Sequence, residues 1–169
     1  QELQSLGRLT GVAPFDHIYD VLQNRCELVL ASGPITEQQW RMLHQQGHWA
    51  PALTAARAAQ GRIWDLSIAH HIEPTAASLS RAIEELEGLC SWTTWVDPTR
   101  GKGNGQIDLC TAEAAAAAAI GLDWLWDDLA EPSRQRMINA LRDKALVPYV
   151  SAANSGAWWY TCYHHYNAV

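Results

Sequence analysis

The sequence predicts an all-α protein made of antiparallel helical hairpins, and two observations predict this fold class. Apolar residues recur at spacings of three and four along most of the 169 residues, and no stretch alternates with the period of two that a strand requires. Mostly short turns separate these amphipathic segments, which favours neighbouring helices that run in opposite directions. The length is that of a single domain, and 48% apolar against 18% charged residues excludes intrinsic disorder.

The first helix with clear end signals is predicted over 36–46. Thr36 is a good N-cap residue, and Gly47 is a natural stop after the last turn. Helical spacing places Trp40, Leu43 and His44 on one side of this segment, so we expect them on its inner face.

Three more helices are predicted before the middle loop of the chain. The segments 49–60 and 61–72 are expected as two separate helices, and the Ala-rich faces of the first let a neighbour approach closely. Pro74 and Thr75 start the clearest helix. Its inward stripe is Leu79, Ala82, Ile83, Leu86, Leu89 and Cys90. Its outward side is Arg81, Glu84, Glu85 and Glu87.

A loop over 91–106 separates this helix from a long Ala-rich one. Asp108 or Thr111 caps the Ala-rich helix, which is expected to run to about Leu129. In the resulting bundle we expect Trp40, Leu86 and Trp124 in the cores between helices.

The last predicted helix begins at Pro132, and Pro148 ends or kinks it. Its inward residues are expected to be Met137, Ile138, Leu141 and Ala145. The segment 145–163 carries no charge, but Pro148 and Gly156 interrupt it. We therefore predict a buried connection there and no membrane span.

Charge and aromatic content narrow the class of function. Twelve Lys and Arg against eighteen Asp and Glu give a net charge of −6, so no basic field is present to bind nucleic acid or an anionic membrane. Nine Trp and five Tyr accompany a single Phe. Trp and Tyr combine an apolar face with a hydrogen-bond donor, which suits polar, ring-shaped ligands.

Cysteine usage and the chain ends indicate the compartment. Four widely spaced cysteines, Cys26, Cys90, Cys110 and Cys162, form no CxxC pair and are expected to be small buried hydrophobes. The chain begins at Gln1 and shows no basic and apolar leader, which leads us to expect that a signal has been removed and that the location is periplasmic or extracellular. Because the chain stops just after its densest polar-aromatic cluster, we expect residues 1–169 to be part of a longer polypeptide.

Several shorter patterns have simpler structural explanations. The glycines of 101–105 follow a helix rather than the strand that a phosphate-binding loop needs, which favours a surface loop. His44 and His48 have a zinc-site spacing but lack the glutamate of a metalloprotease, and Gly47 breaks the helix between them. We therefore predict no metal site and no cofactor in this chain.

Asp123, Asp127 and Asp128 lie beside Trp124 and Trp126 in the sequence. Paired carboxylates next to aromatic residues are also found in glycosidases. Two catalytic carboxyl groups must flank the scissile bond, which residues on one helical face do poorly. These acids are expected to solvate the outside of a helix whose tryptophans are core.

The segment 158–169 is the strongest functional signal. It combines two Trp, three Tyr, two adjacent His and one Asn in twelve residues. Buried polar tips each need a partner, so an inert core rarely collects so many of them. Aromatic faces for sugar rings, together with neutral donors for a carboxylate or hydroxyls, are what a sugar-binding cleft requires.

At this point the sequence resembles the N-terminal helical domain of heparinase II/III-type polysaccharide lyases, over about residues 75–169. The resemblance rests on Leu89-Cys90-Ser91-Trp92…Trp95, Asp108-Leu-Cys-Thr111-Ala112-Glu113 with the Ala run, Gly121-Leu-Asp123-Trp124-Leu125-Trp126-Asp127-Asp128-Leu129 and Pro132-Ser133. The closing Trp158-Trp159…His164-His165-Tyr166-Asn167-Ala168-Val169 stands where the family usually shows a pair of Asn followed by Trp-Asn-x-Val.

The resemblance implies part of an α/α toroid, followed in whole family members by a β-sandwich domain, in which some members carry a structural metal. It implies β-elimination on a uronate-containing polysaccharide such as a glycosaminoglycan or alginate, with no nucleic-acid partner. By position, His164 and His165 fall on the family's Asn pair, and Asn167 on its later Asn. These three are the candidate catalytic residues. The candidate substrate-binding residues are Trp158, Trp159, Tyr163 and Tyr166.

Two other functions remain open at this stage. One is a glycoside hydrolase on an α/α barrel that uses Asp123 or Asp127. The other is a non-catalytic glycan-binding module, which the replacement of the family's Asn pair by histidines favours. The family's base/acid Tyr and the histidine of its β-domain fall beyond Val169, so the chain alone is expected to be inactive. The sequence leaves the uronate polymer and the oligomeric state undetermined.

Overall fold

The computed structural model describes residues 5–99 and 107–157, and all regular structure in these ranges is helical. The predicted all-α class is confirmed. The elements are η1 (Leu6–Leu9), α2 (Phe15–Leu30), α3 (Glu37–Gln45), α4 (Pro51–Ile72), α5 (Ala76–Ser91), α6 (Leu109–Trp124), α7 (Glu131–Leu141), η2 (Arg142–Leu146) and α8 (Val147–Asn154).

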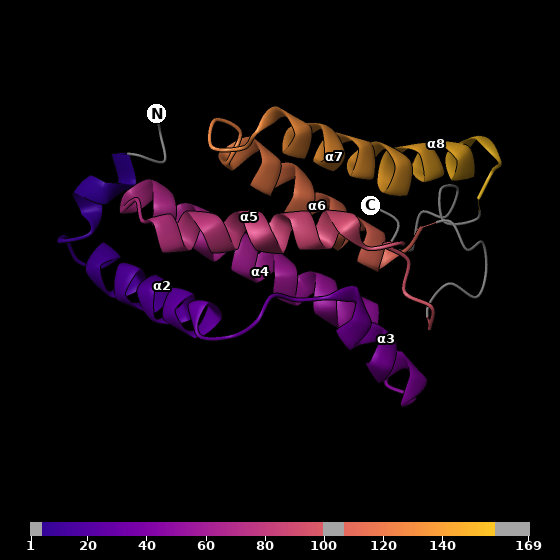
Figure 1. The fold of residues 1–169 in the computed structure, drawn as a ribbon, viewed down its shortest axis with the longest axis horizontal. Coiled ribbons are helices and arrows are strands. Elements are labelled where there is room, and N and C mark those ends of the chain that lie inside the picture. Colours follow the sequence, from indigo (N-terminus) through magenta and orange to yellow (C-terminus); the bar gives the residue numbers. More distant parts are fainter. Residues whose placement is uncertain (1–4, 100–106, 158–169) are drawn as a thin grey trace.

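The helices from α4 onward run alternately in opposite directions. Figure 1 shows α4 and α6 running one way and α5 and α7 the other, with α8 continuing the line of α7. The helix α2 lies along the C-terminal half of α4, and α3 lies near the N-terminal end of α4. The expected antiparallel hairpins are therefore present in α4–α5 and α6–α7.

Small residues line the contact between α4 and α6, as the Ala-rich sequence predicts. Ala56, Ala59, Ala114 and Ala117 are at most 1% exposed. Gly121 marks the closest approach, because a Cβ added there would lie 2.7 Å from Cγ2 of Ile63. Side chains this short let two helix backbones pack closely at little cost in side-chain entropy.

The predicted core residues are buried to different degrees. Trp40 and Leu86 are 1% and 0% exposed, which confirms their placement. Trp124 is only partly buried, and its ring packs against Trp64 with the ring centroids 6.5 Å apart. Leu43 and Ile138 were expected to face inward, but they are 38% and 37% exposed, so the inner faces of their helices are narrower than the spacing predicts.

Side-chain caps fix the starts of three helices where the sequence places them. Thr36 and Gln39 form a capping box on α3, and Thr75 accepts a hydrogen bond from the backbone N–H of Ser78 on α5. On α6 the cap is Asp108, and Thr111 completes the box by accepting from the backbone of Asp108. Each cap satisfies donors that the first turn of a helix leaves without partners.

Two predicted helix boundaries are wrong. The segments 49–60 and 61–72 form the single helix α4, because burial of both halves outweighs the modest helical penalty of Gly61. The helix α6 ends at Trp124 rather than near Leu129, and the chain continues through turns to α7.

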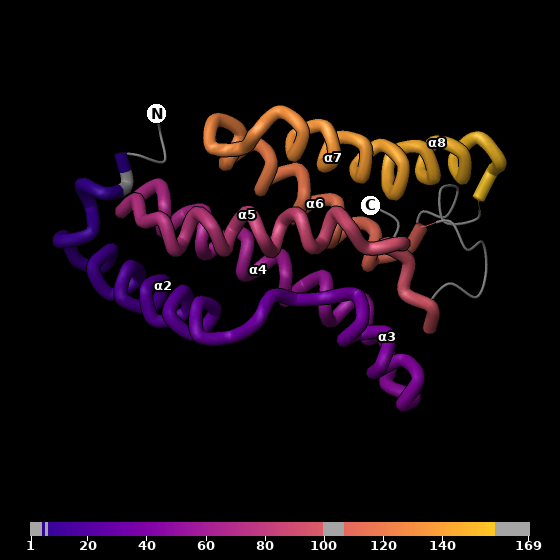
Figure 2. The backbone as a smooth tube through the Cα atoms, in the orientation of Figure 1, coloured from indigo at the N-terminus to yellow at the C-terminus, as the bar shows by residue number. Residues whose placement is uncertain are grey.

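The chain passes Pro148 without leaving the helix. Figure 2 shows the backbone running from α7 through η2 into α8 as one rod, and η2 is a π-helical turn. Proline lacks an N–H and crowds the preceding turn, and the wider turn lies immediately before it. The expectation that 145–163 is a buried connection is wrong for its described part, since Leu146, Val147 and Val150 are 61%, 55% and 54% exposed.

None of the helices in the described ranges is long and apolar enough to cross a membrane. Three of the four cysteines lie in those ranges. Cys26, Cys90 and Cys110 are free and buried, as predicted, while Cys162 lies outside the described residues.

Glu85 was expected to face outward, yet its side chain is fully buried. Its Oε1 accepts from Arg62 at 2.9 Å, and its Oε2 accepts from the backbone N–H of Ile35 at 3.0 Å. Arg62 and Arg81 also donate to backbone carbonyls in the connection between α2 and α3. Glu85 is buried because this connection folds over it and supplies its hydrogen-bond partners.

Candidate functional site

The residues that the sequence singles out as the site lie outside the described part of the chain. These are His164, His165, Asn167, Trp158, Trp159, Tyr163 and Tyr166. The described chain leads to them at Ala157, which follows α8 and is 4% exposed. The glycine-rich loop 101–105 also falls outside the description.

The described residues that flank these segments in the chain lie at the same end of the bundle. In Figure 1 the end of α5, the start of α6 and the end of α8 lie on one side of the molecule. We call this side the loop end and define it by residues 47–53, 92–99 and 107–111. Hydrogen bonds join its three parts, so it forms one connected unit.

Asp97 is the centre of the loop end. Its carboxylate is fully buried and accepts from the backbone N–H of Leu53 at 2.9 Å, in the first turn of α4. The other oxygen accepts from the backbone N–H and the hydroxyl of Thr99, at 2.9 and 2.6 Å. A carboxylate with all these donors, at the positive end of a helix, holds the surrounding structure together.

Asp108 continues the network on the other side of Asp97. One carboxylate oxygen accepts from the backbone N–H of Asp97 at 2.9 Å, and the other caps α6 through the backbone N–H of Thr111. Burial raises the pKa of Asp108, and the backbone hydrogen bonds partly offset this rise. The Thr111 hydroxyl donates to the carbonyl of Trp95 at 3.1 Å, which ties α6 to the loop.

Lys144 fixes the other edge of the loop end. From the π-helical turn η2 its ammonium group donates to the carbonyls of Cys90 and Trp92, at the end of α5, and lies 5.6 Å from the ring centroid of Trp95. A cation near the last carbonyls of a helix is favourable. Burial lowers the pKa of Lys144, and nearby Cys90 and Glu37 act in the opposite direction.

Tryptophans in the loop end, and Trp40 of the adjacent α3, differ sharply in exposure. Trp40, Trp92 and Trp95 are each 1% exposed, and Trp40 and Trp92 pack with ring centroids 6.1 Å apart. Trp49 is 72% exposed. The next residue, Ala50, has a left-handed backbone with φ of 49°, which is rare for a residue other than glycine.

The acids considered for a glycosidase lie at the C-terminal end of α6 and in the turns that follow it. Asp123, Asp127 and Asp128 are exposed, as expected for solvating residues, but Trp126 beside them is 44% exposed and therefore not core. His70 and His71 lie in the last turn of α4 nearby, and Nε2 of His71 lies 2.8 Å from the carbonyl oxygen of Trp124.

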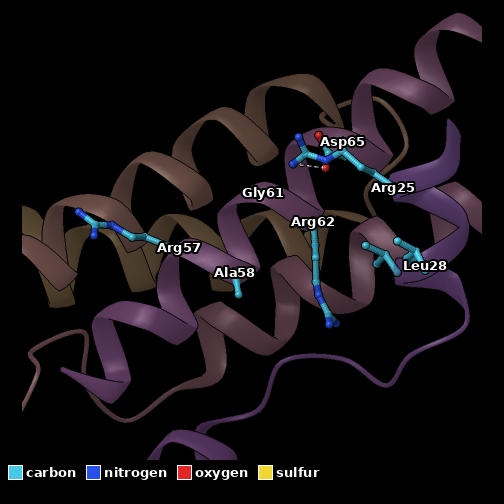
Figure 3. Close-up of a pocket in the computed structure, with 8 residues that line it drawn as sticks. Arg25, Leu28, Arg57, Ala58, Gly61, Arg62 and Asp65 are labelled. Carbon is cyan, nitrogen blue, oxygen red and sulfur yellow. Dashed lines mark ion pairs between the residues drawn. The ribbon is translucent and has the colours of Figure 1, made fainter. Parts of the chain in front are cut away.

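A groove of about 310 Å³ runs between α2 and α4. Figure 3 shows Arg25 paired with Asp65 on one wall, while Arg57 and Arg62 extend in other directions. Arg57 pairs with Glu113 at 2.9 Å, and Arg62 pairs with Glu85. Each of the three guanidinium groups at the groove is already paired with a carboxylate, which lowers its availability for an anionic ligand.

The described residues contain no group of three metal-ligating side chains close enough to hold an ion. No family model matches this sequence, and comparison with curated proteins gives no match.

Sequence reasoning missed Asp97 and Trp49 of the loop end, and it missed Lys144, which contacts the loop end from η2. Asp97 had a usable signal, since an aspartate followed by Pro-Thr favours a turn in which its side chain accepts from the backbone two residues on. No sequence signal identified Lys144, because its hydrogen bonds to the end of α5 depend on a π-helical turn that the spacing of apolar residues does not reveal.

Proposed function

We propose that this chain is the helical part of a polysaccharide lyase that cleaves uronate-containing polysaccharides by β-elimination, and that its helical hairpins belong to an α/α toroid. The observation that carries the proposal is that residues of separate resembling segments form one unit. Trp95 donates from its indole nitrogen to the carbonyl of Leu89 and accepts at its own carbonyl from Thr111, which shares a capping box with Asp108. A motif set whose members contact one another is more specific than the same motifs scattered over a surface.

The chemistry begins with a weak carbon acid next to the uronate carboxylate. A base removes the proton from that carbon, the glycosidic C–O bond on the neighbouring carbon breaks, and the departing oxygen takes up a proton. The product sugar carries a carbon–carbon double bond conjugated with its carboxylate. Negative charge spreads onto the carboxylate as the proton leaves, so the enzyme must stabilise that charge.

We assign this stabilisation to His165, with His164 and Asn167 in support. A neutral imidazole donates one hydrogen bond to the carboxylate, and an imidazolium adds positive charge. Adjacent residues on a helix diverge by about 100°, so only one of the two histidines is expected to point directly at the substrate. Trp158, Trp159, Tyr163 and Tyr166 are assigned to binding the sugar rings.

The test compares histidine variants in the full-length protein. His165→Ala should lower the elimination rate about a hundredfold, as expected for loss of a group that stabilises developing charge. His44→Ala is the control, since His44 is an exposed residue of α3. The readout is ultraviolet absorbance of the conjugated product on alginate, hyaluronan, chondroitin and heparan sulfate. Near-parent rates in His165→Ala, with unchanged melting temperature, would contradict the assignment.

The same assay separates the remaining functions. Cleavage without ultraviolet absorbance identifies a hydrolase. Binding without any product identifies a glycan-binding module, which the histidines at the family's Asn-pair positions favour among the alternatives.

A further inference from the structure

The helix α2 is attached to the bundle through fewer buried side chains than the central helices are. Of its 16 residues, Cys26 and Val29 are buried, whereas seven residues are buried in α6, which has the same length. Ile18 and Leu28 of α2 are 58% and 73% exposed. Because burial of apolar area supplies most of the free energy that holds a helix in place, α2 is held more weakly than α6.

The contact between α2 and α4 is also incomplete. The groove of about 310 Å³ lies along it, and Ala58 and Gly61, with little or no side chain, line its α4 side (Figure 3). The ion pair of Arg25 with Asp65 joins the two helices there at 2.7 Å, but the Arg25 side chain is 57% exposed. An ion pair this exposed adds little stability. The side chains along this part of α2 therefore leave it loosely packed.

A buried charged cluster holds the connection between α2 and α3. Glu85 of α5 is fully buried and accepts from the backbone N–H of Ile35 at 3.0 Å. Arg62 of α4 pairs with Glu85, and Arg62 and Arg81 each donate to a backbone carbonyl of the connection at 2.7 Å. Because Glu85 is shared by both arginines and by the connection, these bonds form and break together. We call these three side chains, Glu85, Arg62 and Arg81, the Glu85 cluster.

We propose that α2 and the connection after it, residues 15–35, open as one unit from the surface of α4 and α5 while the central helices stay folded, and that the Glu85 cluster is the latch that keeps this unit closed. A unit with few buried apolar residues opens at a smaller free-energy cost than a helix at the centre of the bundle. Opening exposes the Cys26 thiol and the part of α4 and α5 that lies under α2. The inference is independent of the lyase proposal, and its test has no bearing on that proposal.

The experiment is backbone hydrogen exchange of the full-length protein at pH 7, followed by NMR. The slowest amides of α2 should exchange at least about tenfold faster than the slowest amides of α4, because they are released without global unfolding. Equal rates in the two helices would refute the proposal, since α2 would then open only when the whole fold unfolds.

A change in the central core separates the two kinds of opening. Met137 is fully buried on α7, and its surroundings stay folded when the unit opens. Met137→Ala should therefore speed exchange of the slowest α4 amides about tenfold or more and leave those of α2 within twofold of the parent. Ile63→Val is a milder change in the same core, for use if Met137→Ala does not fold, and should do the same by a few-fold. Equal acceleration in both helices would overturn the proposal.

Glu85→Gln tests the latch, because it keeps the shape of the side chain and removes its charge. It should speed exchange of the α2 amides about tenfold or more. Glu87→Gln is the matched control on the same helix, since Glu87 pairs with Arg136 of α7 at 2.6 Å, and it should leave the α2 amides within twofold of the parent. Unchanged α2 exchange in Glu85→Gln, or an equal effect in Glu87→Gln, would refute the latch.

The Cys26 thiol provides a second readout, because it is buried on α2. Its rate of labelling by a thiol reagent, resolved by mass spectrometry, should change in the variants as the α2 amides do, while staying below the rate in urea. Labelling of Cys26 that follows the α4 amides instead would contradict a separate opening of α2.

Discussion

Replacing Gly121 with alanine tests the close contact between α4 and α6. The added Cβ would lie 2.7 Å from Cγ2 of Ile63 and 3.2 Å from Cδ1 of Leu86. Carbon atoms pack best at about 3.5–4.0 Å, so the first contact overlaps by roughly 1 Å. Both neighbours are fully buried and cannot swing into solvent. The core must therefore shift to accept a single methyl group.

Two opposing effects set the magnitude. Overpacking of a filled core costs about 1–3 kcal/mol, while alanine gains about 1 kcal/mol over glycine in a helix interior. We expect Gly121→Ala to lower the free energy of unfolding by about 1 kcal/mol, which lowers the melting temperature by roughly 3 °C for a chain of this size. Gly88→Ala is the control, because its added Cβ would meet only the carbonyl of Ile35, at an ordinary 3.7 Å. The free energy of unfolding of Gly88→Ala should rise by about 0.5–1 kcal/mol, because alanine has a higher helix propensity than glycine.

The assay is urea unfolding followed by far-ultraviolet circular dichroism, with the midpoint and slope compared among the variants. Adding Ile63→Ala provides a double-mutant cycle, in which the Ile63 truncation should cost less in the Gly121→Ala background because the new methyl group occupies part of the space. A midpoint for Gly121→Ala at or above that of the parent would refute the reasoning.

Two further predictions concern buried groups. Glu85→Ala leaves Arg62 and Arg81 without their shared carboxylate, so it should lower the free energy of unfolding by about 3 kcal/mol and the melting temperature by roughly 10 °C. The control is Glu84→Ala, which removes the exposed partner of Arg81 and should change the melting temperature by less than about 2 °C. Equal changes in the two variants would contradict the role of burial. Burial raises the pKa of the Cys26 thiol to about 11 and that of Cys90 to about 12. At pH 8 only about one in a thousand Cys26 side chains is therefore the reactive thiolate. The rate at which a thiol reagent labels the two cysteines should rise as the pH approaches these pKa values. In a Cys162→Ser variant a thiol reagent should label the native protein slowly at pH 8 and the urea-unfolded protein at once; rapid native labelling would contradict the burial.

From residue 36 onward, sequence reasoning predicted most of the helices better than their ends and faces, whereas α2 was not predicted. The caps at Thr36, Thr75 and Asp108 were identifiable because a cap is a local interaction between residues three apart. The continuity of α4 through Gly61 was not, since burial of residues far apart in the sequence overrides local propensity.

The same distinction applies to the candidate site. Glu85 follows the outward pattern of α5, and only the folded connection between α2 and α3 makes it a buried residue. Asp97 is likewise defined by the start of α4, 44 residues earlier in the chain. The candidate histidines and tryptophans stand out by composition, and Asp97 and Asp108 by local turn and cap patterns. The contacts through which these two carboxylates join α4 to α6 are recognisable only in the folded chain.

The π-helical turn η2 has a consequence for how this region tolerates insertions and deletions. A π turn holds one residue more than the α-helical turn it replaces. Because the π turn takes up its extra residue within one turn, removing a residue between Arg142 and Leu146 would let the rod close into regular α-helix and leave α8 close to its present phase. The position of Lys144 would change instead, and with it the hydrogen bonds from its ammonium group to the carbonyls of Cys90 and Trp92. The extra residue therefore determines where Lys144 meets the end of α5, and α8 can keep its direction without it.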